Sequence, residues 1–346
     1  MKVKKLISVM LAVVMIIGFG MTRLTMAAEA VTKEKIGLLM IGHGEPETFD
    51  EKAWSEGLHE MFKEFRESGM EEVPPDDAFP MIMEEIKQKY EKIGGRSRHA
   101  EFTRKEVAAV AKQLPGIDVR LGFNEFIGPS FTDIAEQMVK DGIKKLAVIV
   151  MLVTDSTHTG EVRNKLNALG LEKRGVKIVM GHPLFYRPET VQLQVQEIIK
   201  AAGKIPYDQV GVVLACHGEP DVWTNANRDN TRCKEQELAL VACIKKGLLE
   251  KGFVWDNMVQ GFNEFTKPEL PAAVEKLGER NLKRVIVQPA FGTTDGTHIS
   301  YDIPTKSRSA LVDPSIELIV LPGWNENPLL IKAYLELAKD AIKQLK

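Results

Sequence analysis

Residues 41–46 read IGHGEP, and residues 215–220 read ACHGEP. A second motif, GFNEF, occupies Gly122–Phe126 and returns at Gly261–Phe265. The two motifs recur in the same order, which indicates an internal duplication. Two copies separated by more than about 100 residues predict two similar lobes rather than a solenoid of short repeats.

A third repeated feature strengthens the evidence for the duplication. An apolar run precedes Thr157-His158 in the first half, and another precedes Thr297-His298 in the second. The first half carries extra residues between its HGEP and its GFNEF, so we expect an insertion over residues 47–98. Each half therefore places one histidine in HGEP and one after a later apolar run.

Short apolar runs alternate with amphipathic stretches in both halves. Runs of Val, Ile and Leu without polar alternation are typical of parallel strands covered on both faces. We predict an α/β fold of two lobes, each a parallel four-stranded sheet flanked by helices. The lobes are expected at residues 31–203 and 208–346. The predicted strands are Ile36–Ile41, Val119–Phe123, Leu146–Val153, Lys177–Met180, Val210–Ala215, Met258–Phe262, Val285–Ala290 and Ile316–Leu321.

Residues 1–30 have the pattern of a cleavable secretory signal peptide: a lysine-rich start, an apolar stretch and a small-x-small triplet at Ala28–Ala30. An uncleaved anchor is the alternative, but the apolar stretch is shorter than the roughly 20 residues that a span needs. We therefore expect a periplasmic or otherwise exported protein.

The composition narrows the class of partner. Lys and Arg total 46, Asp and Glu total 48, and no basic block occurs, so nucleic acid is a poor candidate. Cys216, Cys233 and Cys243 lack the spacing of a zinc motif or a disulfide framework. The sequence is compatible with a homo-oligomer.

Four histidines follow predicted strands at equivalent places: His43, His158, His217 and His298. Ligands of parallel sheets bind at the carboxyl ends of the strands. Neutral imidazole binds borderline divalent metals and exchanges protons near neutral pH, so these histidines predict a metal-binding or acid–base site. Carboxylates such as those of GFNEF, Glu125 and Glu264, could orient them. The other histidines, His59, His99 and His182, are not repeated and are interpreted as surface or packing residues.

The chain resembles a known family. LLMIGHGEP at residues 38–46 resembles the start of class II tetrapyrrole chelatases, the group of CbiX- and CbiK-type sirohydrochlorin cobaltochelatases and ferrochelatases. AFGTTDGTHISYDIP at 290–304 resembles the segment that closes the CbiX site, and GWNENP at 323–328 resembles CbiK-type sequences. IGGRSRHAEFT at 93–103 resembles the stretch after the ferrochelatase lip. The resemblance covers residues 36–346.

The resemblance implies two lobes facing across a cleft that holds a tetrapyrrole, with a divalent metal delivered by histidine and a carboxylate. It implies His217 and His158 as catalytic metal ligands, assisted by Glu189 or another cleft acid. It adds His298 and His43 to the metal ligands, with His43 in a pseudo-symmetric second site. No glutamate directly follows His298, which favours the cobalt-type enzymes over protohaem ferrochelatase.

The insertion allows two hypotheses. Its helices could pack only on their own lobe, or they could form a lid over a flat ligand. In the second case apolar side chains would cover the ligand face and two arginines would meet its carboxylates. The residues concerned are Phe62, Phe65, Phe79 and Met81, with Arg96 and Arg98 as the arginines; of these, Phe79, Arg96 and Arg98 are the candidate binding residues.

We therefore expect an exported chelatase that inserts Co²⁺, or alternatively Fe²⁺, into a tetrapyrrole such as sirohydrochlorin. The metal is a substrate, so no permanent cofactor is expected. A non-catalytic periplasmic carrier of tetrapyrrole or metal is one alternative, which export favours. A histidine phosphatase-like enzyme is another, suggested by the HGE turn, but no arginine precedes His43 or His217 to hold phosphate.

Overall fold

The computed structural model describes residues 34–67, 69, 73–220 and 232–346. Residues 36–346 form one compact unit, and the predicted signal peptide lies outside the described residues. Within the described part, no helix is both long enough and apolar enough to cross a lipid bilayer.

The described strands form two parallel four-stranded sheets. The first sheet has the order β2-β1-β3-β4, and the second has the matching order β6-β5-β7-β8. The predicted α/β duplication is confirmed, and the strand bounds agree within a few residues. The strands are β1 (Ile36–Gly42), β2 (Asp118–Phe123), β3 (Lys145–Val150), β4 (Lys177–Met180), β5 (Val210–Cys216), β6 (Met258–Phe262), β7 (Arg284–Pro289) and β8 (Glu317–Val320).

Both faces of each sheet are apolar, which explains the unbroken hydrophobic runs. In β1, Leu38 and Met40 enter one core, while Leu39 and Ile41 enter another on the opposite face. The covering helices are α4 (His99–Ala111), α5 (Phe131–Lys140), α6 (Thr157–Ala168), α7 (Pro188–Ala202), α9 (Cys233–Leu249), α10 (Leu270–Gly278), α11 (Ile303–Ala310) and α12 (Pro328–Leu345). A short π-helix, η7 (His298–Asp302), leads into α11.

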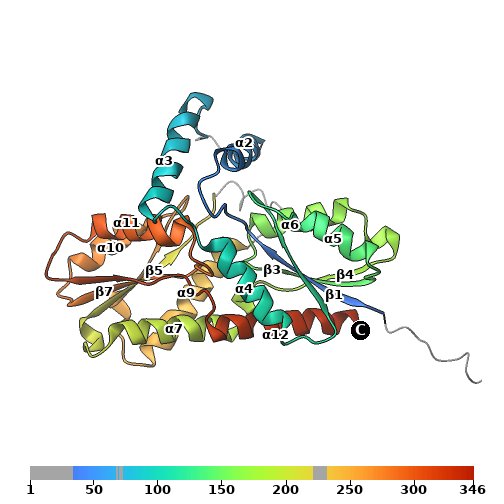
Figure 1. Ribbon diagram of the computed structural model, residues 1–346. Helices are drawn as coiled ribbons and strands as arrows, with labels where there is room; N and C mark the ends of the chain where they lie inside the picture. Colours follow the sequence, from blue (N-terminus) through green and yellow to red (C-terminus); the bar gives the residue numbers. More distant parts are fainter. Residues whose placement is uncertain (1–33, 68, 70–72, 221–231) are drawn as a thin grey trace, which may run out of the picture. The chain divides into compact units, whose positions relative to one another are not determined.

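Two helices are exchanged between the lobes. Helix α12 ends the second half of the sequence but packs on β3 and β4 of the first sheet, while α7 of the first half packs on α9 and β7 of the second (Figure 1). One core therefore runs through both lobes, joining Leu38 of β1 to Leu214 of β5. The sequence boundary near residues 203–208 is consequently not the boundary of two separate cores.

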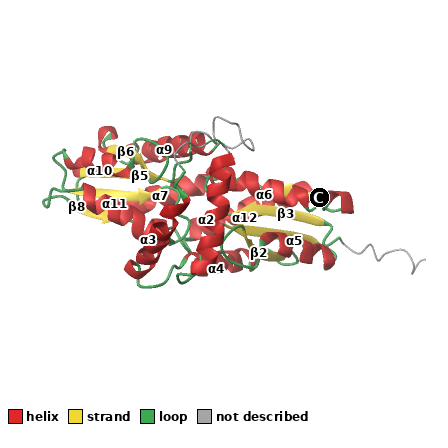
Figure 2. Ribbon diagram, turned by 90° about the horizontal axis from the view of Figure 1, so that it is seen from above, coloured by secondary structure: helices red, strands yellow, loops and turns green. Residues whose placement is uncertain are grey.

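The insertion forms α2 (Glu51–Glu67) and α3 (Phe79–Lys92), which lie above the middle of the compact unit (Figure 2). Helix α2 contacts both lobes. The ring of Trp54 lies 4.6 Å from that of Phe126 in the first lobe, and the ring of Phe65 lies 6.1 Å from that of Phe265 in the second. The insertion thus bridges the two GFNEF loops.

Candidate metal centre

The HGEP and GFNEF motifs meet at the carboxyl ends of the central strands. The backbone nitrogen of Glu125 donates to the His43 carbonyl at 2.9 Å, and that of Glu264 donates to the His217 carbonyl at the same distance. These bonds extend the β1–β2 and β5–β6 ladders past the strands. Each HGEP histidine consequently lies beside a GFNEF glutamate.

The glycine of each HGEP makes this approach possible. Gly44 and Gly218 have positive φ angles of 100° and 88°. A Cβ atom there would lie 2.1 Å from the Glu125 carbonyl oxygen and 2.0 Å from that of Glu264. No side chain fits that gap, so glycine is required for close packing and not only for its backbone conformation.

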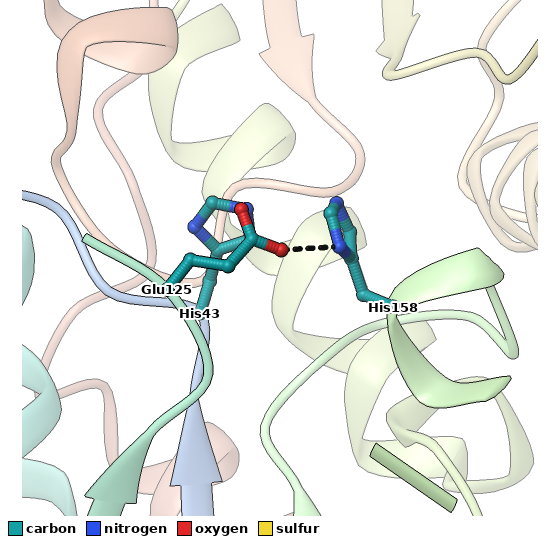
Figure 3. A group of neighbouring side chains, drawn as sticks. All are labelled: His43, Glu125 and His158. Carbon is teal, nitrogen blue, oxygen red and sulfur yellow. Dashed lines mark ion pairs between the residues drawn. The ribbon is translucent and has the colours of Figure 1, made fainter. Parts of the chain in front are cut away.

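The first group joins His43, Glu125 and His158 (Figure 3). Nδ1 of His158 lies 2.8 Å from Oε1 of Glu125, and Nε2 of His43 lies 3.7 Å from Oε2. Nδ1 of His43 is 2.8 Å from the Gly44 carbonyl oxygen and donates to it, so Nε2 is the nitrogen that faces Glu125. The ligand atoms of the group all lie within 4.8 Å of one another.

The second group joins His217, Glu264 and His298 in the same arrangement. Nδ1 of His217 donates to the Gly218 carbonyl oxygen at 2.7 Å. Nδ1 of His298 lies 3.7 Å from Glu264 and 2.7 Å from Asp302. Two imidazoles and one carboxylate form a donor set that suits borderline divalent metals.

The two groups differ in what surrounds them. In the second group, Asp302 pairs with Lys89 of the insertion at 3.0 Å, so α3 reaches the residue that orients His298. In the first group, Glu161 stands 3.7 Å from His158 and pairs with Lys165 of its own helix. The insertion is therefore linked by an ion pair to the second group.

Charge is distributed unevenly over these side chains. Burial lowers the pKa of His217 to about 4, so its imidazole is neutral. Burial alone would also lower the pKa of His298, but Glu264 and Asp302 raise it to about 9. Burial opposes ionisation of Glu125 and Glu264, but the adjacent histidines bring both pKa values below the usual range. Each glutamate is thus an anion between its two histidines.

Comparison with known proteins finds a family that matches nearly all of the described chain. The ferrochelatase model matches residues 35–342. The chain belongs to the ferrochelatase family. A ferrochelatase of Deinococcus radiodurans is 24% identical over 266 residues, which cover 72% of this chain and 82% of that protein.

Solved structures agree on the chelatase-like fold. SirB from Bacillus subtilis with Fe³⁺ matches with a TM-score of 0.58 at 16% identity, covering 89% of this chain and 95% of that one. The sirohydrochlorin chelatase SirB from Bacillus subtilis subspecies spizizenii in complex with cobalt matches with a TM-score of 0.54 at 13% identity, covering 90% and 96%. The predicted membership of the tetrapyrrole chelatase superfamily is confirmed.

In this ferrochelatase-family chain, each metal-binding group takes both of its histidines from one lobe. His158 lies with His43, and His217 lies with His298, so the predicted pair of His217 and His158 does not form one group. The two groups interact electrostatically: burial, His298 and His158 lower the pKa of His217, while Glu264 and the hydrogen bond to Gly218 raise it.

Glu189 does not join either group. It begins α7, where it pairs with Arg187 at 3.2 Å and with Lys332 of α12 at 3.2 Å. The prediction that it assists the metal is therefore corrected: the carboxylates beside the histidines are Glu125 and Glu264. Glu189 instead joins α7 to α12 through its pair with Lys332.

The insertion residues that were predicted to contact a ligand are partly buried and partly exposed. Phe62 and Phe65 are buried inside the insertion and cannot cover a ligand face, whereas Met81 is exposed. Phe79 packs against His59, with the ring centroids 4.3 Å apart and the rings tilted by 41°. Arg96 and Arg98 are exposed and pair with Glu101, so meeting a ligand carboxylate would require them to exchange partners.

His99 has no counterpart in the second half of the sequence, yet it lies beside one of the repeated histidines. It opens α4, and its ring lies 6.3 Å from that of His43. Burial, with His43 and His298 nearby, lowers its pKa to about 3. Its Nδ1 is buried and has no hydrogen-bond partner in the described chain. A neutral imidazole therefore lies beside His43, outside both His–Glu–His groups; in the sequence its only signal is its place in the run after the insertion.

Proposed function

We propose that this protein inserts a divalent metal ion into a tetrapyrrole, and that His217, Glu264 and His298 hold the ion before transfer. The observation that carries the proposal is the pair of His–Glu–His groups at the carboxyl ends of two sheets in a ferrochelatase-family fold. The second group is chosen because Asp302 connects it to the insertion through Lys89.

The chemistry needs a metal donor and a proton acceptor. Insertion binds M²⁺ to four ring nitrogens and releases two N–H protons from the tetrapyrrole. His217 presents a neutral Nε2, because its Nδ1 is engaged by its own loop. The ionised Glu264 lies between the histidines and can accept a proton or balance the charge of the ion.

The preferred substrates are Co²⁺ and sirohydrochlorin, with Fe²⁺ as the second metal. Imidazole suits both ions, and the Irving–Williams order does not separate them by function. Support for cobalt comes from the sirohydrochlorin chelatase that matches this fold and was solved with cobalt. A carboxylate-rich tetrapyrrole would also find Arg96 and Arg98 on the insertion.

Absorbance spectroscopy tests the proposal. Purified protein is mixed anaerobically with sirohydrochlorin or protoporphyrin, then with Co²⁺ or Fe²⁺, and the spectral change of insertion is followed. We expect His217→Ala to abolish insertion and His43→Ala to reduce it less. His182→Ala removes an exposed histidine that belongs to neither group and is the matched control. Full activity of His217→Ala would remove the assignment.

The number of turnovers separates an enzyme from a carrier. A chelatase converts many tetrapyrroles per chain, whereas a periplasmic carrier of the same fold binds at most a stoichiometric amount. We propose export through the N-terminal signal, based on its lysine-rich start, apolar stretch and AEA triplet. Insertion outside the cytoplasm would draw its metal from outside the cytosolic pool.

A further inference from the structure

A cavity of about 300 Å³ lies in the second lobe between α9, β6 and α10. It shares no lining residue with either histidine group. Apolar side chains of β6 and α10 form part of its wall, and the half-exposed ring of Trp255 forms another part. Its volume is at the lower end of the range for small-molecule sites, so a tetrapyrrole does not fit.

Three cationic side chains line this cavity: Lys245, Lys276 and Arg280. Lys245 is 9% exposed, which is unusual for a lysine without an acidic partner. Its Nζ lies 5.1 Å from the centroid of the Trp255 ring and 3.5 Å from Oε1 of Gln260, at the limit of a hydrogen bond. Burial, and then repulsion from Lys276, lowers its pKa.

These cations have no acidic partner among the described residues. In the described ranges, none of the three forms an ion pair within 4.0 Å, although Asp256 also lines the cavity. Arg280 uses one of its N–H groups on Asn257 at 3.1 Å. For comparison, Arg120 on β2 of the first lobe is paired, at 2.7 Å from both Asp118 and Asp141.

We propose that this cavity is a binding site for a small polyanion carrying phosphate or carboxylate groups. A buried ammonium without a counter-ion costs free energy, and a bound anion removes that cost through charge-assisted hydrogen bonds. Lys245, Lys276 and Arg280 of the cavity lining bind the anion, and Trp255 supplies a flat apolar wall. The site is independent of metal insertion.

Isothermal titration calorimetry of the purified protein with pyrophosphate and with citrate, at low ionic strength, tests this site. We expect saturable binding of at least one anion with one site per chain. Binding of pyrophosphate alone identifies a phosphate ligand, and binding of citrate alone identifies a carboxylate ligand. Lys245→Met and Lys276→Met should each weaken binding by about tenfold or more.

Lys251→Met is the matched control. It removes the same charge, but from an exposed lysine just beyond the end of α9. It should change the affinity less than about twofold. Lys276 is exposed, so Lys276→Met keeps the fold if Lys245→Met does not. Absence of saturable binding to the unmodified protein, or an equal loss in Lys251→Met, would overturn the proposal. Metal insertion should be unchanged in all three variants.

Discussion

Glu45 of the first lobe accepts hydrogen bonds from the backbone nitrogen and the hydroxyl of Thr297, the residue directly before His298 in the second lobe. Glu219 of the second lobe accepts from the backbone nitrogen of Thr157, directly before His158 in the first. All four contacting residues are at least partly buried. The glutamate of each HGEP thus positions the late histidine of the opposite lobe, and the two metal groups are held by reciprocal contacts.

Removing Glu45 should therefore weaken metal binding in the other lobe. In a background of His43→Ala and His158→Ala, here called the second-site variant, only the second group can bind metal. Glu45→Ala in this background should lower Co²⁺ affinity by about 10- to 100-fold, as loss of a supporting contact does at metal sites. Titration calorimetry measures the change. Glu47→Ala, which removes a nearby glutamate that pairs with Arg104, is the control; equal affinities for Glu45→Ala and Glu47→Ala would refute the positioning role.

Metal binding at the second group should increase with pH. His298 has a pKa of about 9 and is protonated at neutral pH, so a metal ion that uses its free nitrogen must displace a proton. The affinity of the second-site variant for Co²⁺ should rise by up to about tenfold per pH unit between pH 6.5 and 8.5. The same shift stabilises the fold below about pH 6.5, and this stability is lost as pH approaches 9.

Asp302→Asn tests the cause of that pH dependence. It removes a carboxylate that raises the pKa of His298, so the rise in affinity should level off at a lower pH. Asp313→Asn, which changes an exposed aspartate, should leave the profile unchanged. A profile that is flat in the second-site variant, or identical after Asp302→Asn, would contradict the assignment.

Gly218→Ala should disrupt the second site and lower stability by more than about 2 kcal/mol, because the new Cβ would collide with the Glu264 carbonyl. Urea unfolding measures the free energy. Gly175 also has a positive φ, 80°, but open space surrounds its missing Cβ. Gly175→Ala should consequently cost only the backbone term of about 1 to 2 kcal/mol. Similar losses at both positions would show that the collision is unimportant.

The mature protein should begin near Ala28–Val31 if the signal peptide is removed on export. Intact mass spectrometry of protein from the native host, after separation of periplasm and cytoplasm, measures this directly. Full-length protein with Met1 or Lys2 at its start, found in the cytoplasm, would reject the export proposal.

The sheets could be predicted because their physical signal is local. Leu38, Leu39, Met40 and Ile41 are all apolar since both faces of β1 are covered, and the second half repeats the pattern. The four strand-end histidines could be found for the same reason, because the repeat marks them twice. Glu125 could be placed near them as a strand-end carboxylate, although its contact with His158 depends on a loop geometry that spacing does not specify.

Other features depend on contacts between distant segments. The apolar face of α12 shows that it is covered, but not that it covers the first sheet. His99 has no repeated counterpart, so only the fold reveals its position beside His43. Glu189 meets Lys332 only because the exchanged α12 packs against α7, whereas its other partner, Arg187, is two residues away in the sequence.

The position of α12 affects the order in which the protein can be completed during synthesis. Leu38 and Met40 are among the first core residues to leave the ribosome, yet the core they join includes Tyr334 and Ala338 of the last helix. Until residues 328–345 emerge, β3 and β4 lack their cover on one face of the first sheet, where only α4 is in place, so the nascent first lobe cannot reach its final stability. For a chain threaded through a translocation channel before it folds, such a delay keeps the early segment in a transportable state.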